Sequence, residues 1–123
     1  MLEIPRDEEC EERITMEIIV DANGPDEQAM GWYYYLQDTL RFPFLTTCVA
    51  ERATSPLRIG DDVEVQDMAP EEECDHEMFV TMSREHGGTL AIPLSQLVCV
   101  DADEATRQGV EDWRYWVARG YEL

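Results

Sequence analysis

The acidic residues of this 123-residue chain gather most densely at residues 71–77 (EEECDHE), where five of seven positions are Asp or Glu. Carboxylates held together on one loop repel each other. A hard divalent cation such as Ca²⁺, which takes about six to eight oxygen ligands, would relieve that repulsion. The other interpretation is a solvated, charged hairpin that discourages edge-to-edge pairing of strands. Composition alone leaves both open.

Asp38 is the second residue whose position suggests chemistry. It falls in the last turn of a helix expected over residues 26–41, where the negative end of the helix dipole disfavours a carboxylate. Arg41, three residues further on, could pair with it. A bound cation shared with a neighbouring acidic loop would explain Asp38 equally well.

A third acidic group, Asp101, Asp103 and Glu104, stands at the expected start of the last helix. Helix capping is the first role predicted for it, and calcium coordination the second. Neither residues 101–103 nor residues 21–23 open an EF-hand. The sixth loop position, which requires glycine, is Thr106 or Asp26, and the twelfth carries no glutamate. Any calcium site is therefore of another kind.

Other catalytic and metal-binding chemistry is weakly supported. The four cysteines at positions 10, 48, 74 and 99 form no C-x-x-C pair and are expected to be reduced and mostly buried. Cys74 and His76 could contribute to a zinc site only with a distant third ligand. There is no phosphate-binding loop, nucleophile elbow or dinucleotide fingerprint. We expect a protein that is not an enzyme.

The expected helices lie at the two ends of the chain. Residues 13–21 alternate like a strand but also fit one helical face, and helix is favoured. The helix over residues 26–41 is predicted to be capped by Asp26. The last helix is predicted to start with a capping box of Asp101 and Glu104 and to stop at Gly120.

Between the helices, the hydrophobic period changes to that of short strands. The candidates are residues 44–52, 63–65, 78–82, 89–94 and 98–100. Five short strands joined by turns predict a small, SH3-like bent β-barrel. The expected fold class is thus α+β: one domain, residues 1–123, with N-terminal and C-terminal helices docked on the barrel.

Charge restricts the possible partners. Nine basic residues, all of them arginine, stand against 28 acidic ones, giving a formal net charge of −19. Such a surface repels nucleic-acid backbones and anionic lipid, so neither is an expected partner. The sequence has no apolar stretch of membrane-spanning length and no signal-peptide pattern at its start, so a cytoplasmic location is expected.

Several segments taken together resemble the small acidic calcium-binding proteins first described in cyanobacteria. They are GWYYYLQDTLRFPF (31–44), TSPLRIGDDVEV (54–65), MAPEEECDHEMFV (68–80), AIPLSQL (91–97) and EDWRYWVARGYEL (111–123). The segments occur in the right order, and the resemblance extends from about Glu12 to the end of the chain. Five separate blocks make it specific.

The resemblance implies a soluble cytoplasmic protein that binds calcium without EF-hands, as a buffer or sensor of free calcium. It makes Asp38, Glu71, Glu72, Glu73 and Asp75 the ligand candidates. The alternative is an acidic interaction module that holds a basic protein or mimics nucleic acid. A third possibility is that the charge only adapts the surface to salt, which would spread acids evenly instead of concentrating them at residues 71–77.

Overall fold

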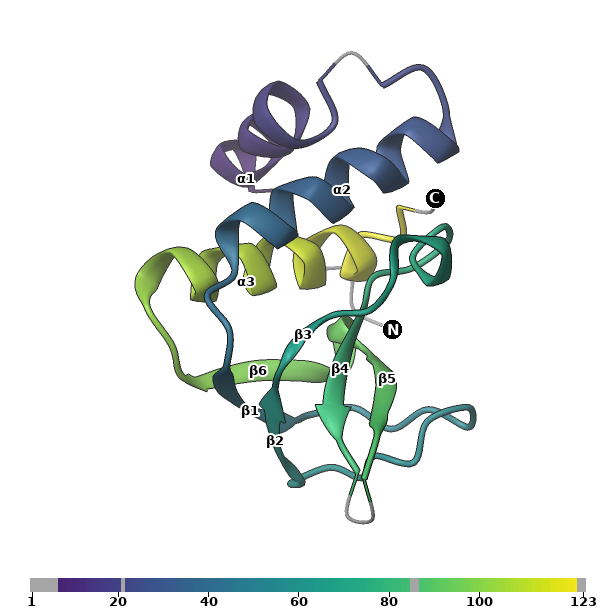
Figure 1. Cartoon of the computed structure of the whole chain (residues 1–123). Helices are drawn as coiled ribbons and strands as arrows, with labels where there is room; N and C mark the ends of the chain where they lie inside the picture. Colours follow the sequence, from purple (N-terminus) through teal and green to yellow (C-terminus); the bar gives the residue numbers. More distant parts are fainter. Residues whose placement is uncertain (1–6, 21, 85–86, 122–123) are drawn as a thin grey trace.

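The computed structural model of the chain describes residues 7–20, 22–84 and 87–121, and these form an α+β fold (Figure 1). The helical elements are α1 (Glu8–Arg13), the π-helical turn η1 (Ile14–Ile18), α2 (Pro25–Thr39), the 3₁₀ turns η2 (Glu71–Glu73) and η3 (Leu94–Gln96), and α3 (Glu104–Ala118). The strands are β1 (Phe44–Cys48), β2 (Asp62–Val65), β3 (Asp67–Met68), β4 (Phe79–Ser83), β5 (Thr89–Pro93) and β6 (Leu97–Asp101). The α+β class predicted from the sequence is confirmed.

The strands form two antiparallel sheets, in the orders β2-β1-β6 and β3-β4-β5. The expected single barrel of five strands is therefore corrected: among the described residues, the hydrogen bonds do not close one barrel. The chain changes sheet at Gln66, between β2 and β3, where the Gln66 amide donates to the Thr81 carbonyl at 2.9 Å. Alternating side chains mark where strands lie, but they do not encode which distant strand each one pairs with.

The N-terminal segment is helical, as favoured, and the strand interpretation is wrong for the described part of residues 13–21. Residues 8–18 form α1 and η1, whereas Asp21 lies outside the described residues. Asp7 caps α1, since its Oδ1 accepts the Cys10 amide at 3.1 Å. The buried face carries Cys10, Ile14 and Ile18, a spacing of four that brings them onto one side of the helix.

Two predicted caps are wrong. Helix α2 begins at Pro25, with Gly24 at the N-cap position and no side-chain cap; proline suits the first helical position because it has no N–H to satisfy. Asp26 therefore lies inside the first turn. In α3, Asp103 is the cap, accepting the Thr106 amide at 2.8 Å. Asp101 belongs to β6 instead.

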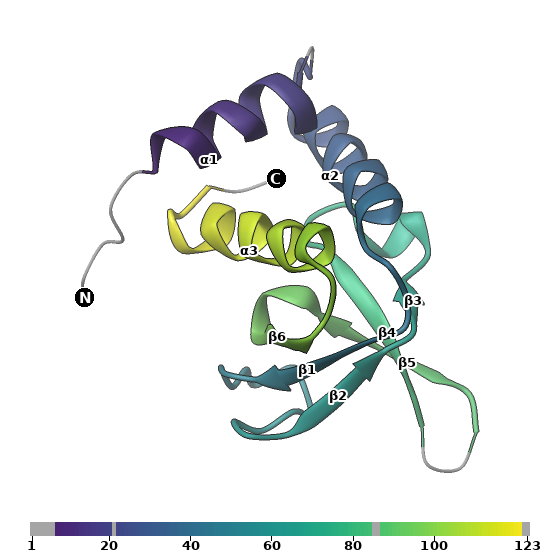
Figure 2. The ribbon, with the colours of Figure 1, turned by 90° about the vertical axis from the view of Figure 1, so that its left-hand side faces the viewer.

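The three helices form a layer over the sheets (Figures 1 and 2). At the centre of this layer Trp32 of α2 meets Trp113 and Trp116 of α3, with ring centroids 5.1 and 5.7 Å apart. Burial of such large rings dominates core energetics. Among the described residues, no helix is both long enough and apolar enough to cross a membrane.

A buried carboxylate links all three helices. Asp112 of α3 is 2% exposed, and its carboxylate accepts hydrogen bonds from Nε and Nη2 of Arg13 at 2.8 and 2.6 Å. The Tyr35 hydroxyl of α2 donates to the same carboxylate at 3.1 Å. Burial and the negative charge of Asp112 raise the pKa of the neighbouring Cys10 thiol to about 12, so this thiol stays protonated at neutral pH.

Helix α2 and the η1 turn approach so closely at Gly31 that a Cβ there would lie 2.4 Å from the Ile18 carbonyl oxygen. Gly31→Ala must push these backbones apart, so we expect a net loss of about 1–2 kcal/mol in the free energy of unfolding, despite alanine's better helix propensity. Urea denaturation measures this loss. Gly24→Ala is the control, since nothing lies within 4 Å of its Cβ position. A Gly31→Ala protein as stable as the parent would contradict the packing described here.

Candidate metal centre

The densest acidic segment forms a tight turn between β3 and β4. After Pro70, the residues Glu71–Glu73 make the 3₁₀ turn η2, closed by bonds from the Glu73 amide to the Pro70 carbonyl and from the Cys74 amide to the Glu71 carbonyl, at 2.9 and 3.0 Å. All three glutamates of the turn are exposed. Glu71, Glu72, Glu73 and Asp75 are called the acidic turn below. The backbone is fixed, and the carboxylates face solvent.

Cys74 anchors this turn to the core. Its side chain is buried at 2% exposure, and its sulfur accepts the Phe79 amide at 3.4 Å and donates to the Phe79 carbonyl at 3.7 Å. Burial raises the pKa of the Cys74 thiol, and the side chain is engaged with the backbone of Phe79. The neighbouring His76 points into solvent, with 82% of its side chain exposed. The geometry gives no support to a zinc site at these two residues.

Two adjacent tyrosines of α2 connect the helix to the acidic turn. The buried Tyr33 donates its hydroxyl to the Ala69 carbonyl at 2.8 Å, directly before the turn. The exposed Tyr34 donates to the Glu71 carboxylate, at 3.2 and 3.3 Å to its two oxygens. This hydrogen bond raises the pKa of Tyr34, because ionised tyrosine would face a carboxylate. Helix α2 therefore holds one side of the site.

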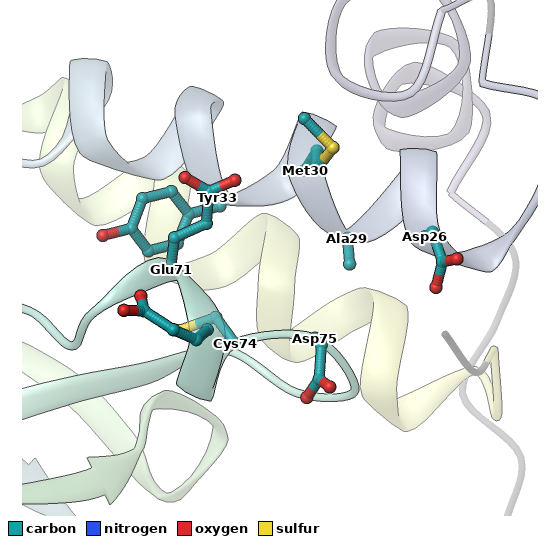
Figure 3. Close-up of a pocket in the computed structure, with 8 residues that line it drawn as sticks. Asp26, Ala29, Met30, Tyr33, Glu71, Cys74 and Asp75 are labelled. Atoms are coloured by element: carbon teal, nitrogen blue, oxygen red, sulfur yellow. The ribbon is translucent and has the colours of Figure 1, made fainter.

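A pocket of about 440 Å³ lies between the first half of α2 and the acidic turn (Figure 3). It is lined by Asp26, Ala29, Met30, Tyr33, Glu71, Glu72, Cys74 and Asp75. In Figure 3 the Glu71 carboxylate reaches toward α2, while Asp26 extends from the first turn of that helix toward the level of the acidic turn. The structure thus brings three of the predicted acids, Glu71, Glu72 and Asp75, to one cavity.

Sequence reasoning missed Asp26 as part of this cavity because it gave Asp26 the role of helix cap. A four-residue spacing could have shown it: Asp26, Met30, Tyr34 and Asp38 follow one another at every fourth position. Residues four apart lie on the same side of a helix, about 6 Å apart along its axis. Each step of four residues also turns by about 40°, so the stripe winds around the helix, with a carboxylate at each end and Met30 and Tyr34 in the middle.

Asp38 lies one turn beyond Tyr34, the residue of α2 that donates a hydrogen bond to Glu71. It is exposed, and within the described ranges it forms no ion pair with Arg41. Arg41 instead places its Nε 3.2 Å from the Asp103 carboxylate. The simpler explanation of Asp38, a local pair with Arg41, is therefore wrong, and its ligand role stays a prediction.

The remaining acids of residues 71–77 differ in environment. Glu77 is engaged, since its carboxylate pairs with Arg52 and accepts the Ser95 hydroxyl at 3.3 Å. Asp75 lies 3.9 Å from the His76 ring nitrogen, with both side chains largely exposed. Glu73 is exposed and does not line the pocket. Glu77 is thus paired with a cation, whereas among the described residues no arginine pairs with the acidic turn, and only the exposed His76 lies beside Asp75.

The second candidate group lies apart from the first. The β6–α3 connection and the β3–β4 connection are at opposite ends of α3 in Figure 1. Asp103 is the N-cap of α3, and its carboxylate accepts a hydrogen bond from Thr106. This hydrogen bond lowers the pKa of the Asp103 carboxyl group. Asp101 and Glu104 are exposed beside it. Capping is therefore observed for Asp103, while a calcium role for Asp101, Asp103 and Glu104 stays a prediction.

Within residues 7–20, 22–84 and 87–121, no three His, Cys, Asp or Glu side chains are gathered closely enough to hold a metal ion. The donors at the pocket are nevertheless of one chemical kind. Carboxylate oxygens are hard ligands that suit calcium and magnesium and not soft metals. The donor set fits calcium in chemistry, and its side chains are exposed and can reorient.

Fold and site together define a class: an α+β protein with clustered hard donors on a turn that is not an EF-hand. A family model described as calcium binding, Calci_bind_CcbP, matches residues 12–117. The chain belongs to this CcbP family of calcium-binding proteins, and the resemblance seen in the sequence is confirmed. Calcium binding, and not a catalytic activity, defines the family.

Solved structures agree with this assignment. The crystal structure of Anabaena CcbP superposes with a TM-score of 0.86 at 41% identity, covering 100% of both chains. The structure of a calcium-binding protein in its calcium-binding form superposes with a TM-score of 0.79 at 40% identity, covering 96% of each chain. Among curated protein sequences, none matches the chain.

The hydrogen bonds between α2 and the segment of the acidic turn can be tested by substituting Tyr33 and Tyr34. Tyr33→Phe leaves the buried Ala69 carbonyl without its donor, so we expect a loss of about 1–2 kcal/mol in the free energy of unfolding. Tyr34→Phe is the matched control, because its hydrogen bond is exposed and contributes under about 0.5 kcal/mol. Equal effects in urea denaturation would show that Tyr33 does not hold the turn.

Proposed function

We propose that this chain binds Ca²⁺ with the carboxylates of the acidic turn, joined by Asp38 from α2. The observation that supports it most is the pocket, which is lined by acids from two separate elements, α2 and the acidic turn. Loop and helix supply carboxylates from opposite sides, as a cation with many oxygen ligands requires. Membership of the CcbP family supports the choice of ion.

The binding energy on this proposal comes from relieved repulsion as well as from coordination. The chain carries 28 acidic residues against nine basic ones, and among the described residues no arginine pairs with the acidic turn as Arg52 pairs with Glu77. A divalent ion adds the missing positive charge where carboxylates are densest. Because the exposed side chains reorient while Cys74 and Tyr33 fix the backbone, binding costs mainly side-chain entropy.

The physiological role that follows is that of a cytoplasmic calcium buffer or sensor. A buffer needs only reversible binding, whereas a sensor must also change a surface that another molecule reads. The proposed ligands come from α2 and from the acidic turn, so calcium would alter the surface between them. This position favours a sensor as well as a buffer.

Calcium should stabilise the fold against heat. At free calcium 100-fold above Kd, binding adds about 2.7 kcal/mol and should raise Tm by about 10 °C. Thermal melts in calcium and in chelator at matched ionic strength measure the shift. Magnesium is the control and should give a much smaller shift, since it demands octahedral geometry and gives up water reluctantly. Equal shifts with both ions would indicate a diffuse counterion cloud and overturn the site.

Asp38→Asn tests the ligand role of α2. Removing one coordinating charge should weaken calcium affinity by about tenfold or more, equivalent to at least ~1.4 kcal/mol. The calcium-free protein should be unchanged or slightly more stable, because the substitution removes a negative charge near the C-terminus of α2. Calorimetric titration and a melt in chelator give both values.

Glu111→Gln is the matched control, removing the same charge from an exposed position of α3. Its calcium affinity should stay close to that of the parent, since one exposed charge among many has little long-range effect in salt. Equal weakening by both substitutions would mean that only net charge matters. Unchanged binding in Asp38→Asn would remove Asp38 from the site.

A further inference from the structure

The pocket between α2 and the acidic turn has an apolar wall that a calcium ion does not need. Ala29, Met30 and Tyr33 line it on the helix side, opposite the carboxylates. A bare cation interacts with oxygens only, so these side chains offer it nothing. A cavity of about 440 Å³ is also much larger than one ion and lies in the range of organic ligand sites.

The apolar surface continues along α2 beyond the pocket. Met30 is 46% exposed and Tyr34 is 45% exposed, and their spacing of four places them side by side on the helix. We call these two side chains the Met30–Tyr34 ridge. The ridge covers about 6 Å along the helix axis, and Asp26 and Asp38 lie one turn beyond its two ends, about 18 Å from each other.

We propose that the pocket and the Met30–Tyr34 ridge dock a basic amphipathic segment of another protein. Charge complementarity identifies the occupant: Lys or Arg side chains would meet Glu71, Glu72 and Asp26, while aliphatic side chains of the same segment cover Met30 and Tyr34. Long basic side chains suit this surface because their stems pack on apolar groups while their heads pair with carboxylates. The whole span from Asp26 to Asp38 is too long for a single small cation and corresponds to about three turns of a helix.

Calcium and the basic segment would compete for the same carboxylates. This part rests on the proposed calcium site, whereas docking in the absence of calcium does not. By linkage, each ligand weakens the other by the same factor. Calcium would then release the partner by neutralising the acidic turn, and this is how the protein would act as a sensor.

The test uses the full chain and a labelled, amphipathic Leu/Lys peptide of 14 residues with its leucines on one helical face, followed by fluorescence anisotropy in chelator. A second peptide of the same composition, with leucines spread around the helix, controls for charge alone. We expect the amphipathic peptide to bind at least about tenfold more tightly, since only it presents an apolar face to the ridge. Equal affinity for both peptides would overturn the proposal.

Two matched substitutions locate the docking surface. Met30→Ala should lower the affinity for the amphipathic peptide by about fivefold, the loss expected for one truncated apolar contact. Met16→Ala is the control, because Met16 is 64% exposed and lies beside glutamates in another surface hollow. It should leave the affinity unchanged. Equal weakening by both, or weakening only by Met16→Ala, would overturn the assignment to α2.

Saturating calcium should then lower the affinity for the amphipathic peptide by about tenfold, as expected when one ion neutralises shared carboxylates. Binding of the peptide in chelator with no change in calcium would disprove the competition but keep the docking surface. Calcium binding by titration without peptide binding would disprove the docking surface and leave the proposed function standing. The two failures are therefore distinguishable.

Discussion

The arrangement of the helices depends on one buried carboxylate, Asp112. Asp112 belongs to α3, and its two carboxylate oxygens accept hydrogen bonds from Arg13 of α1 and from Tyr35 of α2. A buried charge is costly unless it is fully paired, and breaking such a pair typically costs about 3–5 kcal/mol. The directional bonds therefore select one relative placement of the three helices, around which Trp32 and Trp113 pack. A purely apolar interface would leave that placement less specified.

That placement sets the position of α2, and α2 in turn meets the acidic turn. Trp32 and Tyr35 face the other helices, whereas Tyr33 and Tyr34 face the β3–β4 connection. Successive residues of a helix point about 100° apart, so four consecutive aromatic positions serve two partners. On the other side, Cys74 holds the turn to β4. The backbone on both sides of the pocket is thus fixed from the core, and only the carboxylates are left free.

Much of this could be predicted from the sequence where the signal is local. Helical spacing located α2 and α3, alternation located most strands, and the run at 71–77 marked the acidic turn. What failed depends on distant partners: Arg41 pairs with Asp103 instead of Asp38, and Gln66 carries the chain from one sheet to the other. Asp26 was assigned to a cap because a cap is a local interaction, whereas its pocket forms only when α2 meets the acidic turn. Local rules cannot rank a short-range partner against one that the fold brings from far along the chain.

Some carboxylates of the chain are paired with an arginine or a helix N-terminus, whereas those of the acidic turn are clustered with each other. This difference argues against salt adaptation as the whole explanation of the net charge. Asp112 has Arg13, Glu77 has Arg52, and Asp103 has both a helix N-terminus and Arg41. A surface adapted only to salt would scatter uncompensated acids evenly. Here, Glu71, Glu72 and Asp75 stand together on one rigid turn against the apolar side of α2, where their mutual repulsion opposes folding. A cluster of this kind is stabilised by any cation, metallic or organic, that binds it, because the added positive charge relieves the repulsion.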